Sequence, residues 1–334
     1  MMRTVTPFTE EQARLLVNLH QRYDAWMSAE QTLHQMPYDL RRKEVAGKAY
    51  LYEIHDRGGN GKSLGPWSAA QEARFGAYRA AKADAKLRRD GAAGTLAESA
   101  RLYRALRLPM LASAAGPILR EADRRSLLGS DLLVIGTNAT TAYAIEANGF
   151  IRQLPDETED LDLAWAAERE AEDQRVWDLL KTVDPTFTVN TERTFQARNA
   201  KAYEVEILVA PSRAGTMARA DRPRPVPLPE QEWLLLGTPV SHVVVCRDGS
   251  PARIIAPDPR WFALQKLWMA EQKKRNPQKR PKDHKQGMLL LDAVAEAMPQ
   301  YPLDAGFEAQ LPGELAPFFA AWSAQRPPPV LPSW

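Results

Sequence analysis

Apolar residues near the N-terminus recur at three- and four-residue spacing, which is the period of an amphipathic helix. The stripe consists of Leu15, Leu16, Leu19, Tyr23, Trp26 and Met27. Thr9 precedes the stripe and Gln12 follows Thr9 by three residues, so the pair predicts a capping box at the start of the helix. Capping residues and alanine-rich composition predict further helices at 68–89, 95–106 and 112–128. The first hundred residues are therefore expected to be mainly helical.

Short apolar runs replace the helical period after Asp131. Residues 132–135 form a continuous apolar run of strand length that ends at Gly136, and residues 139–147 return to helical spacing. The strand, tight turn and helix are thus expected to follow one another directly. Further strands are predicted at 49–54, 150–154, 161–165, 194–197, 203–209, 240–246 and 252–255. The first of these leads into a glycine-rich turn at 58–61.

The C-terminal third returns to helical patterns. A proline-rich linker or surface segment at 222–229 and the hairpin 240–255 precede helices predicted at 259–274, 282–298 and 312–325. Prolines after Arg326 predict an extended tail. The chain is therefore expected to be an α+β protein in which a small mixed sheet with helices is flanked by helical regions. The predicted regions are a mainly helical part at 1–110, the sheet-containing core at 111–257 and a helical part at 258–334.

Composition excludes several classes of protein. Cys246 is the single cysteine of 334 residues, so no intrachain disulfide is possible and a reducing compartment is expected. The sequence has no apolar leader and no run of about 20 apolar residues, which favours a cytoplasmic protein without a membrane partner. Lysine plus arginine (44) nearly balances aspartate plus glutamate (42), so the net charge of +2 does not by itself predict a nucleic-acid partner.

Two aspartates stand two residues apart on a predicted strand. Asp160 and Asp162 are expected to face the same side of the sheet, while Leu161 and Leu163 point into the core. Paired carboxylates are ligands for Mg²⁺ or Mn²⁺, which bind one or two carboxylates together with phosphate oxygens. Glu206, on a following strand, is the candidate third carboxylate. The sequence therefore predicts a catalytic metal site formed by these three acids.

The turn upstream supplies groups that suit phosphate. Gly136 permits close approach of the backbone, and the amides and hydroxyl of Thr137 lie at a predicted helix N-terminus, where anions bind. Gly136 and Thr137 are therefore predicted to bind phosphate oxygens, such as those of a nucleotide.

The order of strand, Gly-Thr turn, helix, Asp-x-Asp and acidic strand resembles the DNA polymerase beta type nucleotidyltransferase superfamily. More narrowly, the chain is similar to a group of bacterial proteins with the nucleotidyltransferase fold. That likeness rests on Ile135 to Ala139, Tyr143, Gly149, Thr158 to Leu163 and the segment Lys62-Ser63-Leu64-Gly65. The match reaches from about residue 45 to residue 290. It implies a nucleotidyltransferase fold for the core and a nucleotide-binding role for Lys62.

A second resemblance is to the abortive-infection AbiE toxins. Their downstream motifs are matched here by Lys266-Leu267 with Ala270 and by Arg280-Pro281-Lys282-Asp283. The likeness implies that Lys266, Lys282 and Arg280 contact the triphosphate and that Asp283 helps to orient the acceptor, so all four are candidate nucleotide-binding residues.

Together these features predict a metal-dependent transfer of a nucleoside monophosphate from a nucleoside triphosphate to an acceptor hydroxyl, on RNA such as tRNA or on a protein. Two departures from the usual motifs leave an alternative open: Thr137 replaces serine, and the third acid is Glu206, with Glu204 as a rival on the same strand face. The alternative is a non-catalytic module that binds a nucleotide or a partner. A third hypothesis is nucleic-acid binding through the basic stretch 266–285. The sequence predicts no oligomeric state.

Overall fold

The computed structural model describes residues 3–155 and 160–326. Residues 156–159 and the proline-rich tail from residue 327 onward, for which an extended segment is predicted, lie outside the described residues. None of the helices in the described ranges combines the length and apolar content that crossing a bilayer requires.

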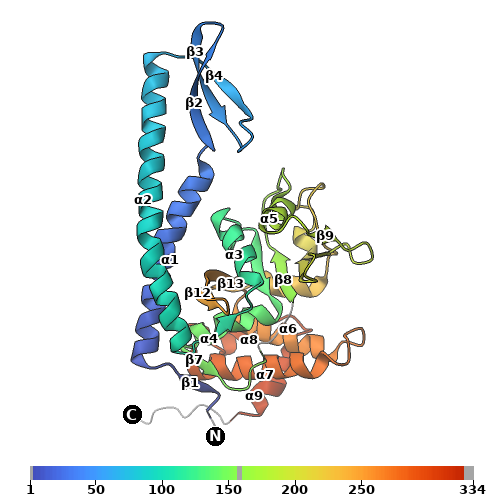
Figure 1. Ribbon diagram of the computed structural model, residues 1–334. Helices are drawn as coiled ribbons and strands as arrows, with labels where there is room; N and C mark the ends of the chain where they lie inside the picture. The colour runs from blue at the N-terminus through green and yellow to red at the C-terminus, as the bar shows by residue number, and fades with distance from the viewer. Residues whose placement is uncertain (1–2, 156–159, 327–334) are drawn as a thin grey trace.

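Two long helices form an arm that carries a small sheet. The helices are α1 (Glu10–Gln35) and α2 (Ala69–Ala105), and the strands between them are β2 (Asp39–Val45), β3 (Lys48–Ile54) and β4 (Gly61–Pro66). The three strands pair as an antiparallel sheet in the order β2-β3-β4. The helices run side by side, and the sheet lies at their far end, away from the rest of the protein (Figure 1).

The start of α1 confirms the predicted capping box. The Thr9 hydroxyl accepts a hydrogen bond from the Gln12 amide, and the Gln12 side chain accepts one from the Thr9 amide.

The two helices predicted at 68–89 and 95–106 are one continuous helix, α2. Gly91 and Gly94 each weaken a helix by about 1 kcal/mol. Packing of α2 along α1 outweighs this cost, so the glycines do not interrupt the helix.

A five-stranded sheet lies at the centre of the body. Its strands are β6 (Leu132–Ile135), β8 (Asp160–Trp165), β9 (Thr188–Val189), β10 (Gln196–Arg198) and β11 (Glu204–Val209). They are arranged in the order β6-β8-β11-β10-β9, and β8 runs parallel to β11 and antiparallel to β6. The predicted strand–turn–helix is confirmed: β6 leads through a 3-10 turn, η1 (Gly136–Asn138), into α4 (Ala139–Glu146). The predicted hairpin of β10 and β11 is also confirmed.

Smaller elements surround this sheet. The predicted hairpin of β12 (Val240–Cys246) and β13 (Pro251–Ala256) is present and is extended by β5 (Met110–Leu111). A separate two-stranded sheet joins β1 (Val5–Pro7) to β7 (Gly149–Ile151). Helices α3 (Ala115–Arg124) and α5 (Arg175–Val183) lie beside the sheet, and short 3-10 segments occupy Pro211–Arg213 and Pro229–Leu235. The mixed architecture confirms the predicted α+β class.

Four C-terminal helices cover one end of the body: α6 (Pro259–Glu271), α7 (Arg280–Ala297), α8 (Ala305–Glu308) and α9 (Ala316–Ala324).

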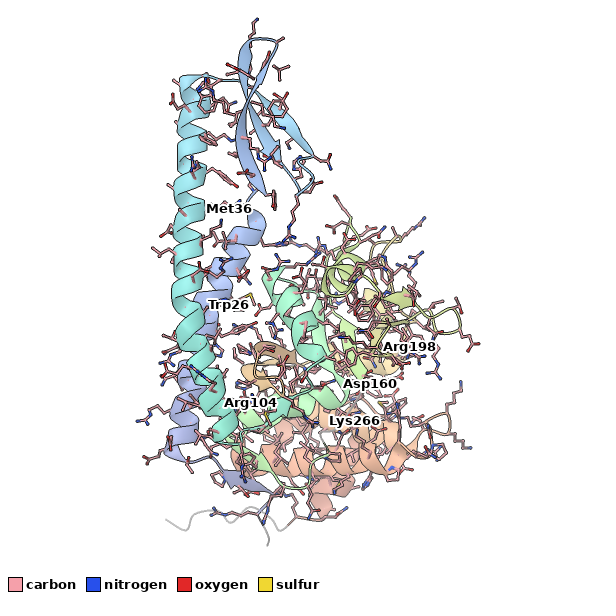
Figure 2. All side chains as sticks on the ribbon, in the orientation of Figure 1. Trp26, Met36, Arg104, Asp160, Arg198 and Lys266 are labelled. Carbon is pink, nitrogen blue, oxygen red and sulfur yellow. The ribbon has the colours of Figure 1, made fainter. Side chains whose placement is uncertain are left out.

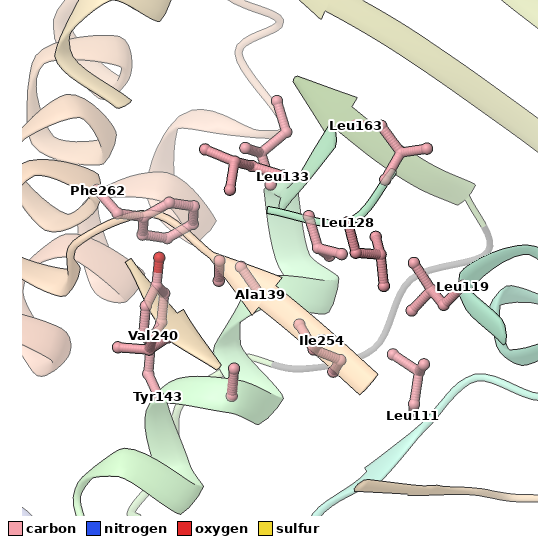
Figure 3. Close-up of a cluster of buried hydrophobic side chains, with 14 of the residues drawn as sticks. Leu111, Leu119, Leu128, Leu133, Ala139, Tyr143, Leu163, Val240, Ile254 and Phe262 are labelled. Atoms are coloured by element: carbon pink, nitrogen blue, oxygen red, sulfur yellow. The ribbon is translucent and has the colours of Figure 1, made fainter. Parts of the chain in front are cut away.

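Buried side chains from all three predicted regions pack into one apolar cluster, including Tyr23, Leu163 and Phe262. Figure 3 shows Leu133, Leu163, Ile254, Tyr143 and Phe262 within it. The predicted boundaries at 110/111 and 257/258 therefore do not separate hydrophobic cores. Trp261 and Phe262 of α6 are buried in this cluster.

Asp258 fixes the start of α6. Its side chain is fully buried and accepts hydrogen bonds from the Arg260 amide at 2.9 Å, the Arg260 guanidinium at 2.7 Å and the Thr238 amide at 3.0 Å. Gly237 has a positive φ of 75°, and a Cβ at this position would lie 2.2 Å from the Asp258 carboxylate. The glycine thus allows the preceding loop to close over the cap.

We expect Asp258→Ala to lower the free energy of unfolding by about 3–5 kcal/mol, because it leaves the buried part of Arg260 without its carboxylate. Urea unfolding at pH 7 measures the loss. The matched control is Asp304→Ala, which removes an exposed N-cap aspartate from the short helix α8 and should cost only about 1 kcal/mol. Equal losses in the two variants would contradict the role assigned to Asp258.

Candidate functional site

Strand β8 presents the two predicted carboxylates on one face. Leu161 and Leu163, which alternate with them, are 0% and 1% exposed and lie in the core, as predicted. Asp160 and Asp162 both line a cavity of about 450 Å³ between the sheet and the C-terminal helices. Figure 2 labels Asp160 together with Arg198 and Lys266, which line the same cavity from other elements. The alternation of a strand is thus what brings both aspartates to the cavity.

The turn after β6 is shaped around Asp162. Gly136 has a φ of +64°, and a Cβ there would lie 2.0 Å from Asp162 Oδ2, so only glycine allows the carboxylate to lie against the turn. The next residue, Thr137, lines the cavity. Asn138 Nδ2 donates to the backbone carbonyl of Asp160 at 2.7 Å. Asn138 was not predicted, and it ties the turn to the first residue of β8.

The acids of β11 lie opposite the aspartates of β8. In the parallel register Glu204 pairs with Asp160, and Glu206 pairs with Asp162. The buried Gln196 side chain donates to Glu204 Oε2 at 2.8 Å and to Glu206 Oε1 at 3.0 Å. Glu204 also binds Arg198 and lines the cavity.

The predicted three-carboxylate metal site stays a prediction. Within residues 3–155 and 160–326, no group of three histidine, cysteine, aspartate or glutamate side chains is placed to hold one metal ion. The Glu206 side chain accepts a hydrogen bond from Gln196. Glu206 is also absent from the described residues that line the cavity, whereas its rival Glu204 is among them. The part played by Glu206 stays a prediction.

Crowded negative charge marks the sheet side of the cavity. Desolvation, with the nearby charges of Asp160 and Glu206, raises the pKa of Asp162 to about 7, and Lys266 and Lys279 oppose the shift. Desolvation and Asp160 also raise the pKa of Glu206. A divalent cation would relieve this repulsion. Two carboxylates that are open to phosphate oxygens are a donor set that Mg²⁺ accepts, so Asp160 and Asp162 fit such an ion.

Cationic side chains form the opposite wall. Lys266 of α6 is only 6% exposed, and its Nζ donates to Asp283 Oδ1 at 2.9 Å. Arg275 Nε, in the loop between α6 and α7, donates to Asp283 Oδ2 at 2.7 Å. Although burial alone would raise the pKa of Asp283, the Lys266 ammonium and the Arg275 hydrogen bond outweigh it, and the pKa lies below its usual value. Lys279 and Lys282 complete this wall.

Several predicted residues therefore meet at one cavity, whereas Arg280 and Lys62 are engaged elsewhere. Asp160, Asp162, Thr137, Lys266, Lys282 and Asp283 all line it. Arg280 instead donates to the backbone carbonyls of Gln272 and Lys273 and holds the α6–α7 loop. Lys62 lies in β4 on the distal sheet, beside Glu53 at 3.3 Å, so it is not brought to the cavity.

The site also contains residues that were not predicted. Arg275, Lys279 and Arg198 line the cavity, and the first two fall in the basic stretch 266–285. That stretch gave the general signal of positive charge, but no local spacing distinguished Arg275 or Lys279 from Arg280. Asp283 is shown as the partner that holds Lys266 and Arg275, which the motif alone did not indicate.

Comparison with known proteins places the chain in a family. A family model described as "Nucleotidyltransferase" matches residues 113–310, which is more than half of the chain. The chain therefore belongs to this nucleotidyltransferase family, whose substrates are nucleotides. The matched region contains the turn, both aspartates and the cationic wall.

A solved structure shows a more distant likeness. It is described as an antigenic nucleotidyltransferase-like protein from Paracoccidioides brasiliensis, and it is 18% identical with a TM-score of 0.37. The match covers 65% of this chain and 90% of that chain. The comparison with curated proteins gave no match.

We expect Gly136→Ala to lower the free energy of unfolding by at least about 1–2 kcal/mol, because alanine is disfavoured at positive φ and its Cβ meets Asp162. Thermal unfolding measures the change. Gly94→Ala is the control, since that glycine lies within α2 with no atom within 4 Å of the added Cβ. It should instead stabilise the protein by about 0.5–1 kcal/mol. A stabilising effect at position 136 would rule out the close approach.

Asp283→Asn should lower the free energy of unfolding at pH 7 by about 3 kcal/mol, because Lys266 keeps its buried charge without a full counter-charge. The folded-state pKa of Asp283 is lowered, so its contribution is complete above the unfolded value of about 3.9 and is lost as the pH falls below it. Urea unfolding of both proteins between pH 6 and pH 3 should show the gap narrowing at low pH. Glu271→Gln, at an exposed position, should change stability by less than about 0.5 kcal/mol. A gap that widens on acidification would contradict the assignment.

Proposed function

We propose that the cavity binds a nucleoside triphosphate and that the protein transfers its nucleoside monophosphate to an acceptor hydroxyl, releasing pyrophosphate. The observation that carries the proposal is the opposition of two carboxylates on β8 to a wall of cations on α6, α7 and their loop, across a single cavity. A triphosphate has the negative charge that the wall attracts. Membership of the nucleotidyltransferase family supports the same reaction class.

In this proposal Asp160 and Asp162 hold Mg²⁺ or Mn²⁺. When bound, the ion offsets the charge of the phosphate oxygens and stabilises charge that develops during transfer. Lys266, Lys279 and Lys282 bind and orient the triphosphate. Asp283 keeps Lys266 aimed across the cavity through their 2.9 Å contact.

The hydroxyl and amide of Thr137 are assigned to a phosphate oxygen, because this residue lines the cavity at the turn before α4. The proton of the acceptor hydroxyl passes to a carboxylate of β11. Glu206 is proposed for this role, and Glu204, which lines the cavity, is the alternative. The acceptor is proposed to be a hydroxyl of RNA or of a protein.

The test offers each of the four labelled nucleoside triphosphates to the protein with Mg²⁺ and with RNA or protein from a lysate. Label should move to a macromolecule. Asp160→Asn/Asp162→Asn should lower the rate by at least about 10³-fold, since it removes the charges that hold the ion. The matched control Glu170→Gln/Glu172→Gln removes the same charge from exposed positions and should transfer at the native rate. Transfer that is equal in both double variants would refute the proposal.

Comparison of Glu204→Gln with Glu206→Gln in the same assay shows which acid of β11 accepts the proton. The variant that lacks the proton acceptor should lose at least about 10²-fold in rate, whereas the other should lose much less. Equal, small losses in both would exclude a β11 carboxylate from proton transfer.

A second candidate function is a nucleotide-binding module without turnover. It is favoured by the engagement of Glu206 with Gln196 and by the lack of a three-acid group among the described residues. Calorimetry with a non-hydrolysable triphosphate distinguishes the enzyme from the binding module. Binding that requires Mg²⁺ supports the enzyme, and binding indifferent to Mg²⁺ supports the module.

A further inference from the structure

The distal end of the arm projects beyond the body. Apart from Ala85, the buried residues of α2 are Leu96, Ser99, Ala100 and Tyr103, so the helix meets the rest of the protein with its C-terminal part. The segment 69–95 spans roughly 40 Å at 1.5 Å per residue. The three-stranded sheet lies beyond the body at the end of this segment (Figure 1).

Positive charge is concentrated on this projecting part. Residues 37–89 contain twelve lysines and arginines against six aspartates and glutamates, a formal charge of +6. The whole chain carries only +2, so all other residues together carry −4. The near-neutral composition therefore hides a strongly basic arm.

A cavity of about 760 Å³ opens where α2 meets the end of α1 and the sheet. Its cationic lining residues are Arg41, Arg57, Arg79, Lys82, Lys86 and Arg89. Among the described residues that line it, Asp39 is the single acid, and it is bonded to Arg41 at 2.8 Å. Arg89 pairs with Asp90 at 2.8 Å and with Glu30 at 3.8 Å, both outside the lining. Neither Arg57 nor Lys86 forms an ion pair with a described acidic side chain. The cavity thus keeps a large excess of positive charge.

The cations of α2 form a row. Arg79, Lys82, Lys86 and Arg89 follow one another at spacings of three, four and three residues, which places them on one face of the helix over about 15 Å. Such a row matches the extended charge of a polynucleotide backbone better than a single phosphate.

Two tyrosine rings, one exposed and one half-buried, accompany this row. Tyr38 is 44% exposed and lines the cavity beside Tyr78. The Lys82 ammonium lies 5.1 Å from the Tyr78 ring centroid and 5.8 Å from that of Tyr38. Aromatic faces beside cations are the arrangement on which unpaired bases stack while the backbone is neutralised. An acidic peptide would be attracted by the cations but has no bases to stack on the tyrosine rings.

We propose that this arm cavity, formed by the residues above, binds single-stranded RNA. Unpaired, splayed bases that stack on aromatic side chains are typical of RNA recognition. The site is separate from the cavity of the proposed transfer reaction, and binding to it does not depend on that reaction. A binding measurement can therefore fail or succeed independently of any nucleotidyl transfer.

The test measures fluorescence anisotropy of a labelled single-stranded RNA of about 20 nucleotides, long enough to cover a basic groove, titrated with full-length protein at several salt concentrations. Arg57→Glu/Lys86→Glu should weaken binding at least about tenfold and reduce the slope of log affinity against log salt by about 1.4, the value for two lost phosphate contacts on a single strand. Tyr38→Ala should weaken binding without changing this slope, because it removes stacking and no charge.

The matched control is Arg74→Glu/Arg101→Glu, which makes the same change in net charge at exposed positions of α2 outside the cavity. It should change the affinity by less than about threefold. The proposal is overturned if native protein does not bind the RNA, or if the two double variants lose affinity equally. Tighter binding of single-stranded DNA, duplex RNA or polyglutamate would also overturn the assignment to single-stranded RNA.

Discussion

The contact between Asp162 and the backbone of Gly136 joins the two halves of the candidate site. Gly136 ends β6 at a positive φ, and the carboxylate of β8 occupies the space that a Cβ would fill. Because β6 and β8 are also hydrogen-bonded neighbours, the turn and the strand cannot shift independently. Asn138 strengthens the same junction through the Asp160 carbonyl. The positions of both aspartates and of Thr137 therefore depend on one close approach that glycine alone permits.

A buried group of ion pairs holds the cationic wall in place. Asp283 is buried between Lys266 and Arg275, so one carboxylate fixes two cations from separate elements. Breaking such a buried group costs far more than breaking a surface pair, because a charge is left without its partner. Asp258 and the packing of α6 fix the helix that carries Lys266. The wall is thus set by the C-terminal helices, whereas the carboxylates are set by the sheet.

The arm adds a second charged surface that is separate from this site. Its helices pack on each other for much of their length, and its sheet has few apolar residues to bury. Leu51 and Ile54 of β3 are the fully buried residues of that small sheet. Because its core is so small, most of its side chains are left at the surface, and the exposed charged residues of its strands are mainly basic. This distribution explains how a chain with a net charge of +2 carries a strongly basic arm.

Local patterns in the sequence determined much of the fold. The capping box of α1, the strand–turn–helix around Gly136, the alternation of Asp160 and Asp162 with buried leucines and the hairpins of the body all follow from neighbouring residues, and the structure confirms them. The continuous α2 and the strands β2 and β4 were not predicted, because packing between helices and pairing with β3 decide them. The same limit applies to the site. Which of Arg275, Lys279 and Arg280 faces the cavity, which acid of β11 lines it and where Lys62 lies depend on contacts between residues far apart in the chain. Sequence spacing specifies a periodicity and a face, but only tertiary packing decides what that face meets.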